Sequence, residues 1–194
     1  MNFRTLLAAL VFTLAAPLAL ATDISNTVVL VAKRQLHDRL YGSTIIVARP
    51  LGDDRHLGFI VNKPTTVTLG KLFPKHAPSQ KVIDPVYLGG PMGPEVIFAM
   101  VKGSESPGGR SLQIAPGIYV AFDSNVVDRI IETQPQQARF FAGMVLWAPN
   151  ELAEEMRRGL WYTLDPQPDL FLRKSTDGLW EELVGRSERK ANTI

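Results

Sequence analysis

The sequence predicts an α+β domain built from short strands with helices inserted between them. Apolar, β-branched runs recur along the chain, and many follow one another too closely for the crossover that neighbouring parallel strands need. Helix start and stop signals lie between and after these runs. The chain has no cysteine, so burial alone must hold its core together.

The first residues predict a secretory signal that is removed. Arg4 supplies a positive charge, and the apolar stretch 5–21 ends in an Ala-Leu-Ala triplet suited to cleavage. The stretch is shorter than the ~20 residues that a membrane-spanning helix needs, and Pro17 disfavours a continuous helix near its end. We therefore expect residues 1–21 to be a signal peptide and the periplasmic or secreted protein to begin at Thr22.

The remaining residues, 22–194, are expected to form a single domain with nearly balanced charge. No long Gly-, Ser- or Pro-rich linker divides them, and a domain of ~150 residues buries about 70% of its unfolded surface. One base leaves with the signal, so 20 bases face 19 acids, and the two kinds are interleaved. Nucleic-acid binding relies on clustered Lys and Arg. We therefore expect no nucleic-acid partner and, without a cysteine to acylate, no stable membrane anchor after cleavage.

In the first half, strands are predicted at 27–32, 43–48, 57–62, 82–88 and 96–102. The polar segment 35–42 is expected to be a loop or a single helical turn. Thr68 is placed to cap a short helix, 69–73, because a hydroxyl can accept a bond from a free amide of the first turn. Glycines and prolines in 89–94 predict a tight connection between two strands. The segment 103–110 lacks the Gly-Lys-Ser/Thr ending of a phosphate-binding loop and is interpreted as a plain loop.

In the second half, a hairpin of strands 112–114 and 118–122 is followed by three predicted helices. The first begins at Asp123 or Ser124 and closes before Pro135. The second begins after Asn150, with glutamates in its first turns and arginines in its last, as the helix dipole favours.

The third helix begins at Ser175 or Thr176 and is expected to end at Gly185. Its apolar positions Leu179 and Leu183 recur at helical spacing and are expected to face the core. The polar tail 186–190 that follows is interpreted as a solvated, frayed terminus.

Three segments form the most specific pattern in the chain: 58–64 (GFIVNKP), 88–91 (LGGP) and 147–161 (WAPNELAEEMRRGLW). As a set, they resemble the YqgE/AlgH family of bacterial proteins, whose biochemical activity is not settled. The resemblance runs from about residue 28 to about residue 185. It implies a small, closed, strongly bent β-barrel with further strands and helices packed around it.

The chain also departs from the family pattern. Asn150, Glu151 and Ala153 stand where the family usually has Gly, Gln and Glu, and the strand 96–101 lacks the family's histidine. Most members of the family lack a signal peptide. This chain therefore resembles an exported and divergent member of the family.

The best candidate site is the turn at Gly89 and Gly90, with Asn62 and Lys63 beside it. Consecutive glycine amides can surround an anion, a lysine adds positive charge, and the family pattern links the two segments. The alternative is structural: the glycines are needed because two chain segments cross closely, and Asn62-Lys63 is turn chemistry.

Trp147 is a further candidate for ligand binding, because an indole combines a large contact area with a polar edge. The alternative is that Trp147 and Trp161 pack against the ends of the helix between them. On that helix Glu151 and Glu155 share one face. The helix N-terminus and nearby arginines keep both ionised, so we interpret this face as solvated.

The sequence predicts no catalytic residue, no cofactor and no metal site. The three histidines are scattered, at His37, His56 and His76. The segment 53–56 (DDRH) is interpreted as a surface loop, since no second histidine lies at helical spacing from its own. No Gly-x-Ser-x-Gly motif is present, so an α/β-hydrolase triad has no basis.

The leading interpretation is an exported, non-enzymatic module that binds a small anionic ligand or a protein partner. The alternative is a weak hydrolase or transferase that uses the Gly89-Gly90 turn as an oxyanion site. That alternative needs His37 and Asp38 within hydrogen-bond reach of a serine beside the turn. Transcriptional regulation, a label attached to the family, is disfavoured by the signal and by the balanced charge.

Overall fold

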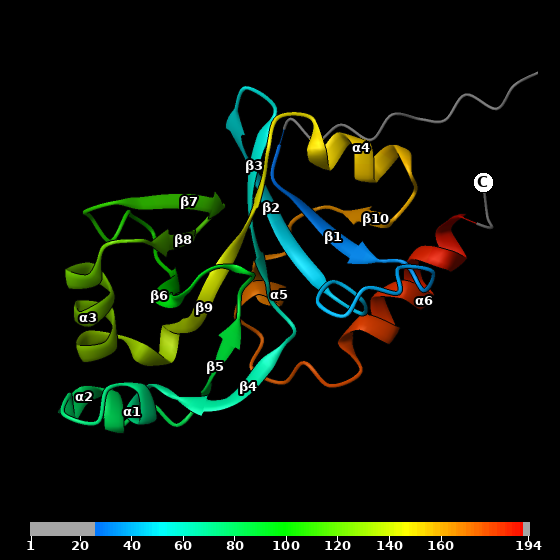
Figure 1. Ribbon diagram of the computed structural model, residues 1–194. Coiled ribbons are helices and arrows are strands. Elements are labelled where there is room, and N and C mark those ends of the chain that lie inside the picture. Colours follow the sequence, from blue (N-terminus) through cyan, green and yellow to red (C-terminus); the bar gives the residue numbers. More distant parts are fainter. Residues whose placement is uncertain (1–25, 192–194) are drawn as a thin grey trace, which may run out of the picture.

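The computed structural model describes residues 26–191, and its centre is a curled sheet of ten strands (Figure 1). The strands are β1 (Val28–Ala32), β2 (Ile45–Gly52), β3 (Arg55–Ile60), β4 (Pro64–Thr68), β5 (Pro85–Leu88), β6 (Met92–Lys102), β7 (Ser111–Ala115), β8 (Ile118–Ala121), β9 (Ala138–Trp147) and β10 (Trp161–Leu164). The helices are α1 (Leu69–Leu72), α2 (Ala77–Gln80), α3 (Ser124–Thr133), α4 (Glu151–Arg157), α5 (Pro168–Leu172) and α6 (Leu179–Ala191), with a 3-10 turn at Pro135–Gln137.

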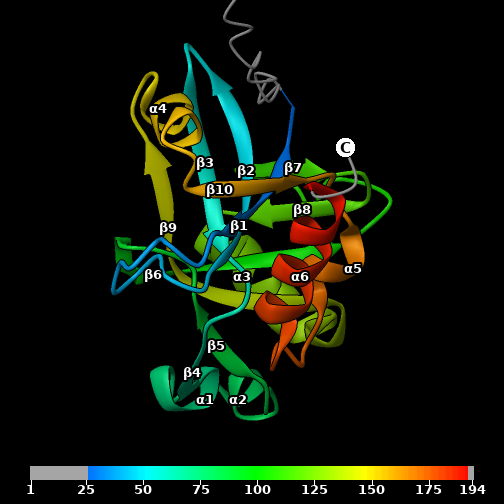
Figure 2. The same cartoon turned by 90° about the vertical axis from the view of Figure 1, so that its right-hand side faces the viewer.

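The strands follow the order β10-β1-β2-β3-β9-β6-β8-β7, and β4 and β5 form a side branch that joins β9. Neighbours are antiparallel except for β5 and β9, which run parallel. The expected α+β fold with a strongly bent barrel is confirmed as a half-barrel, with β10 and β7 as the end strands of the main path. Figure 2 shows the curl from the side.

Strand β9 holds the two halves of the sheet together. Along one edge it pairs with β3 near Trp147 and with β5 at Phe141 and Ala142. Along the other edge it pairs with β6. The sequence interpretation did not assign this strand.

Three apolar clusters pack around the sheet. Strand β1 contributes to two of them, since Val29 and Val31 face one cluster and Leu30 and Ala32 face another. Its uninterrupted VVLVA run follows from this burial on both faces. Helices α5 and α6 cover the first cluster, α3 covers the second on β6, β8 and β9, and α4 covers the third.

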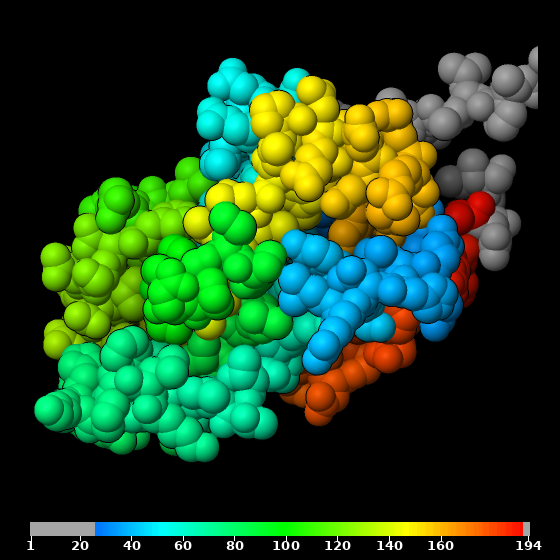
Figure 3. Space-filling model, in the orientation of Figure 1, coloured from blue at the N-terminus to red at the C-terminus, as the bar shows by residue number. Residues whose placement is uncertain are grey.

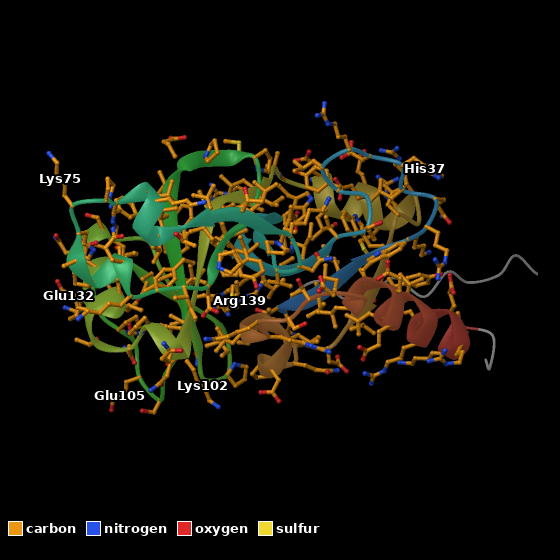
Figure 4. All side chains as sticks on the ribbon, turned by 90° about the horizontal axis from the view of Figure 1, so that it is seen from below. His37, Lys75, Lys102, Glu105, Glu132 and Arg139 are labelled. Carbon is orange, nitrogen blue, oxygen red and sulfur yellow. The ribbon has the colours of Figure 1, made fainter. Side chains whose placement is uncertain are left out.

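Arg139 lies inside the first apolar cluster, and only 3% of the residue is exposed (Figure 4). Its Nη1 donates to the Phe171 carbonyl oxygen at 3.0 Å, and its Nη2 donates to the Val61 carbonyl oxygen at 2.8 Å. The guanidinium carbon lies 3.6 Å from the centre of the Tyr87 ring. Burial lowers the pKa of Arg139, and its interactions with Tyr87 and with the negative charge of Asp84 partly oppose this shift.

Most of the helices and strands that were predicted from local sequence patterns are confirmed. Helix α3 begins after Asp123, whose carboxylate accepts the Asn125 amide at 3.0 Å, and the hairpin β7–β8 lies where it was predicted. Thr68 and Asn150 occupy the expected cap positions of α1 and α4. Neither makes a side-chain cap bond, and Asn150 has a left-handed backbone.

Three expectations about the third helix are wrong. The helix begins at Leu179 and not at Ser175 or Thr176. Helix α6 does not end at Gly185 but continues to Ala191, so 186–190 is not a frayed tail. Gly185 has no positive φ. The buried stripe extends past it to Ser187, whose hydroxyl donates to the Leu183 carbonyl oxygen at 2.8 Å. The glycine that commonly ends a helix has a left-handed backbone, which Gly185 does not have.

The segment 53–56 also differs from its predicted surface loop. Asp53 and Asp54 form the turn between β2 and β3, both with positive φ. His56 already belongs to β3 and is 4% exposed, opposite Trp147 on β9. The expected signal peptide lies outside the described residues. Within 26–191 no helix has both the length and the apolar character needed to cross a membrane.

Candidate functional site

The Gly89-Gly90 turn is a close crossing of two chain segments. Strand β5 lies on one edge of β9 and β6 lies on the other, so the connection between them must pass over β9. It does so at Gly143, where a Cβ on Gly89, Gly90 or Gly143 would overlap with the opposing backbone. The Gly89 amide donates to the Ala142 carbonyl oxygen at 2.8 Å, and is therefore occupied within the sheet.

Asn62 and Lys63 lie beside this crossing, as expected. The Lys63 carbonyl oxygen accepts the Leu88 amide at 2.9 Å. The Asn62 side chain accepts the Ile45 amide at 2.8 Å and donates to the Ser43 carbonyl oxygen at 2.9 Å, so both its ends are used.

The Lys63 ammonium turns back into the fold. It donates to the Leu40 carbonyl oxygen at 2.9 Å. Burial lowers the pKa of Lys63, and the charge of Asp38 partly opposes this. These bonds favour the structural alternative at the crossing over an open anion site.

Trp147 lies at the far end of β9 and is not part of this crossing. Its indole nitrogen donates to Glu155 Oε2 at 3.2 Å, and the indole nitrogen of Trp161 donates to the same oxygen at 2.8 Å. Each tryptophan leaves 4% of its surface exposed. Sequence reasoning placed Glu155 on a solvated face. Instead, it is half-buried and joins α4 to β9 and β10.

The predicted oxyanion site lacks its nucleophile in the described part of the chain. His37 lies on an outer loop (Figure 4), and Asp38 accepts the amides of Leu40 and Tyr41 at 2.8 and 2.7 Å. Neither side chain bonds to a serine within residues 26–191. A close serine–histidine contact elsewhere joins His76 Nδ1 to Ser79 Oγ at 2.7 Å, and Ser79 is fully buried.

An apolar groove is a further candidate site. Two adjoining hollows of about 320 and 470 Å³ share Phe73, Glu95 and Ile97. We call them together the Phe73 groove. It is lined by Thr65, Val67, Leu72, Phe73, His76, Val86, Pro94, Glu95, Val96, Ile97, Phe122, Ser124, Val127, Asp128, Ile131 and Ala142.

The groove forms because β6 leaves β9 at its start. Between Met92 and Ile97 the pairing of β6 with β9 is shifted, so the residues between them bulge away from the sheet. The space is bounded by α1 on one side and α3 on the other. Figure 3 shows these three segments meeting on one face of the molecule.

The groove carries both apolar surface and negative charge. Leu72, Phe73 and Val96 are 43%, 41% and 39% exposed, although large apolar side chains are usually covered. Glu95 and Asp128 contribute carboxylates, and no lysine or arginine is among the lining residues. Sequence reasoning missed this site because its walls come from segments far apart in the chain.

Comparison with known proteins finds consistent similarity along most of the chain. The family described as AlgH-like matches residues 29–192. The UPF0301 protein BF2109 of Bacteroides fragilis is 24% identical over 168 residues, covering 85% of this chain and 84% of the relative. The UPF0301 protein Cpha266_0885 of Chlorobium phaeobacteroides is 26% identical over 159 residues, covering 80% and 82%.

Two solved structures share the fold. The solution structure of the AlgH protein from Pseudomonas aeruginosa has a TM-score of 0.69 at 18% identity. The match covers 82% of this chain and 87% of the AlgH chain. The crystal structure of protein DIP2367 from Corynebacterium diphtheriae has a TM-score of 0.67 at 19% identity, covering 85% and 88%. At these identities the likeness concerns the fold alone.

Proposed function

This chain belongs to the AlgH-like family, and we propose that it is an exported, non-enzymatic module that binds a protein partner through the Phe73 groove. The observation that carries the proposal is the gathering of exposed apolar side chains at Leu72, Phe73 and Val96 around one hollow. Exposed apolar surface of this kind, rimmed by polar groups, marks binding sites in soluble proteins.

The charge of the groove specifies the partner's chemistry. Glu95 and Asp128 repel an acidic ligand and attract a basic one, and the apolar floor at Ile97 favours aliphatic or aromatic side chains. The proposed occupant is therefore a partner segment with apolar side chains and at least one lysine or arginine.

A protein partner in the groove is favoured over a small anion at the Gly89-Gly90 turn. The Gly89 amide, the Asn62 side chain and the Lys63 ammonium all have partners within the fold. The hydrolase or transferase alternative has less support, because it depends on the same turn and on a serine beside His37 and Asp38. The groove does not support transcriptional regulation, because its carboxylates would repel the phosphate backbone of DNA.

The groove is tested with two soluble peptides of matched length, one of leucine and lysine and the other of leucine and glutamate. Chemical shifts of the 15N-labelled protein, residues 22–194, report where each peptide binds. We expect saturable shifts at the groove residues with the leucine–lysine peptide only. The proposal would be overturned if neither peptide bound, or if the leucine–lysine peptide bound at a place other than the groove.

Variants sharpen this experiment. The double substitution of Phe73→Ser and Val96→Ser should abolish binding, whereas Leu51→Ser, an equally exposed apolar position on β2, should not. Urea unfolding of each variant separates loss of binding from loss of fold. A concentration-dependent dimer that disappears in the double variant would make the occupant a second copy of this chain and overturn a distinct partner.

Export is tested separately by fractionating native cells and measuring the intact mass of the protein. The support for export is the charged and apolar pattern of residues 1–21 and its cleavage triplet. We expect protein beginning at Thr22 in the exported fraction. Full-length protein in the cytoplasm would overturn export while leaving the groove proposal intact.

A further inference from the structure

The two ends of the curled sheet face each other across a second hollow, distinct from the Phe73 groove. End strand β7 contacts β2, which pairs with β1, and β1 in turn pairs with the other end strand, β10 (Figure 2). The hollow between them measures about 570 Å³. It is lined by Asn26, Thr27, Val28, Arg49, Gln113, Ala115, Pro116, Asp165 and Pro166. We call it the seam pocket.

Arg49 enters the seam pocket without a protein partner. It has no ion pair or hydrogen bond from its side chain to any residue of the described chain. Its Nε is buried and has no acceptor. A buried guanidinium donor without an acceptor costs free energy, so such a group is normally paired. The hydroxyl of Thr27, in the same pocket, is also buried and unpaired.

Asp165 lines the same pocket and, like Arg49, has no side-chain partner within the described residues. It forms no ion pair with Arg49 or with another base among residues 26–191. Two opposite charges therefore face one hollow while remaining separate from each other. A simple anion bound to Arg49 would also meet the Asp165 carboxylate, which would repel it.

We propose that the seam pocket binds a small zwitterion of the amino-acid class, namely a free amino acid or a dipeptide. The carboxylate of the ligand accepts hydrogen bonds from the Arg49 guanidinium, whose planar fork matches two carboxylate oxygens. The ammonium of the ligand pairs with Asp165. The Thr27 hydroxyl and the Gln113 amide supply further polar contacts at the wall of the pocket.

The proposal does not depend on the Phe73 groove. The groove has acidic lining and binds through apolar side chains, whereas the seam pocket presents one charge of each sign. The two sites share no lining residue. Failure of one therefore leaves the other untouched.

The test is a titration of the 15N-labelled protein, residues 22–194, with L-alanyl-L-alanine. N-acetylated dialanine, which lacks the ammonium, and dialanine amide, which lacks the carboxylate, serve as matched probes. We expect saturable shifts of the Arg49 Nε–H signal and of the Gln113 and Asp165 amides with dialanine. Each blocked probe should bind about tenfold more weakly or worse, because each lacks one charged contact.

Two variants assign the contacts. Arg49→Gln and Asp165→Asn should each weaken dialanine binding by about tenfold or more, while Arg158→Gln, at an exposed position directly after α4 that does not line the pocket, should leave it unchanged. No saturable shift with dialanine would overturn the proposal. Equal binding of the acetylated probe would also overturn it, because the pocket would then be an anion site in which Asp165 has no role.

Discussion

Gly89 lies directly against the carbonyl oxygen of Gly143, so closely that any side chain at Gly89 would overlap it. The contact exists because the chain passes over β9 between β5 and β6. The glycine requirement here is steric, since Gly89 has no positive φ. An alanine at a glycine that is not packed against backbone in this way is expected to be tolerated better than one at Gly89.

Replacing Gly89 with alanine should lower the free energy of unfolding by about 1–3 kcal/mol or more, as overpacking of a tight site does. Gly185→Ala is the matched control, because a Cβ there meets only Arg189 Nη1 at 3.5 Å, within helix α6. It should raise stability by about 0.5–1 kcal/mol. Urea unfolding measures both. A neutral Gly89→Ala would refute the crossing and return the turn to the anion-site alternative.

Arg139→Lys should lower the free energy of unfolding by about 1.5–3 kcal/mol. A lysine keeps the buried charge but cannot reach the carbonyl oxygens of both Val61 and Phe171, and it loses the planar stacking over Tyr87. Arg139→Met should be less damaging, because it also removes the charge. Arg157→Lys, on an exposed side chain, should change stability by less than about 0.5 kcal/mol. A lysine variant as stable as the wild type would contradict this role.

Glu155→Ala should destabilise the protein and disturb two tryptophans at once. The indole N–H groups of Trp147 and Trp161 both lose their acceptor, and each unpaired buried donor costs about 1–3 kcal/mol. Near-ultraviolet circular dichroism and urea unfolding report the change. Glu154→Ala removes only an exposed pair with Arg157 and should cost about 0.5 kcal/mol or less. Similar effects of the two alanine variants would show that Glu155 is merely a surface residue.

Stability should fall in alkaline solution partly because of Tyr41. Burial raises the pKa of Tyr41 above 10.0, and the charges of Glu155, Asp38 and Glu151 raise it further. Below the unfolded pKa both states keep the phenolic proton. As pH rises above it, the unfolded state loses the proton first, so folding loses stability up to the folded pKa.

Tyr41→Phe should therefore lose less stability than the wild type between about pH 9 and about pH 11. Urea unfolding at both values gives the comparison. Glu155→Gln is a second check, since it removes a smaller contribution to the raised pKa and leaves burial in place. Identical alkaline losses in wild type and Tyr41→Phe would exclude the tyrosine as the cause.

Features with local causes could be predicted from the sequence. Asp123 and the spacing of Val126 and Ile130 define helix α3 within a few residues. The link between Lys63 and Gly89 came from the family resemblance and is confirmed by the backbone pairing around them. The resemblance also supplied the bent barrel, which no local pattern reveals.

Features that depend on distant segments could not be predicted. From the sequence alone, Glu155 has the pattern of an exposed acid on a helix surface. Only the folded sheet places Trp147 on β9 and Trp161 on β10 beside its carboxylate. The Phe73 groove needs α1, the shifted start of β6 and α3 together. Arg49 looked like one scattered base, because the sequence does not show that the end strands of the sheet face each other.

The position of β9 in the chain also governs when the protein can fold during synthesis. Its residues, 138–147, reach solvent only after those of β3, β5 and β6, whose sheet pairings they complete. An emerging chain can form local turns and hairpins but cannot join the two halves of the sheet until most of its length has left the ribosome. The sheet is therefore completed only late in the synthesis of the chain.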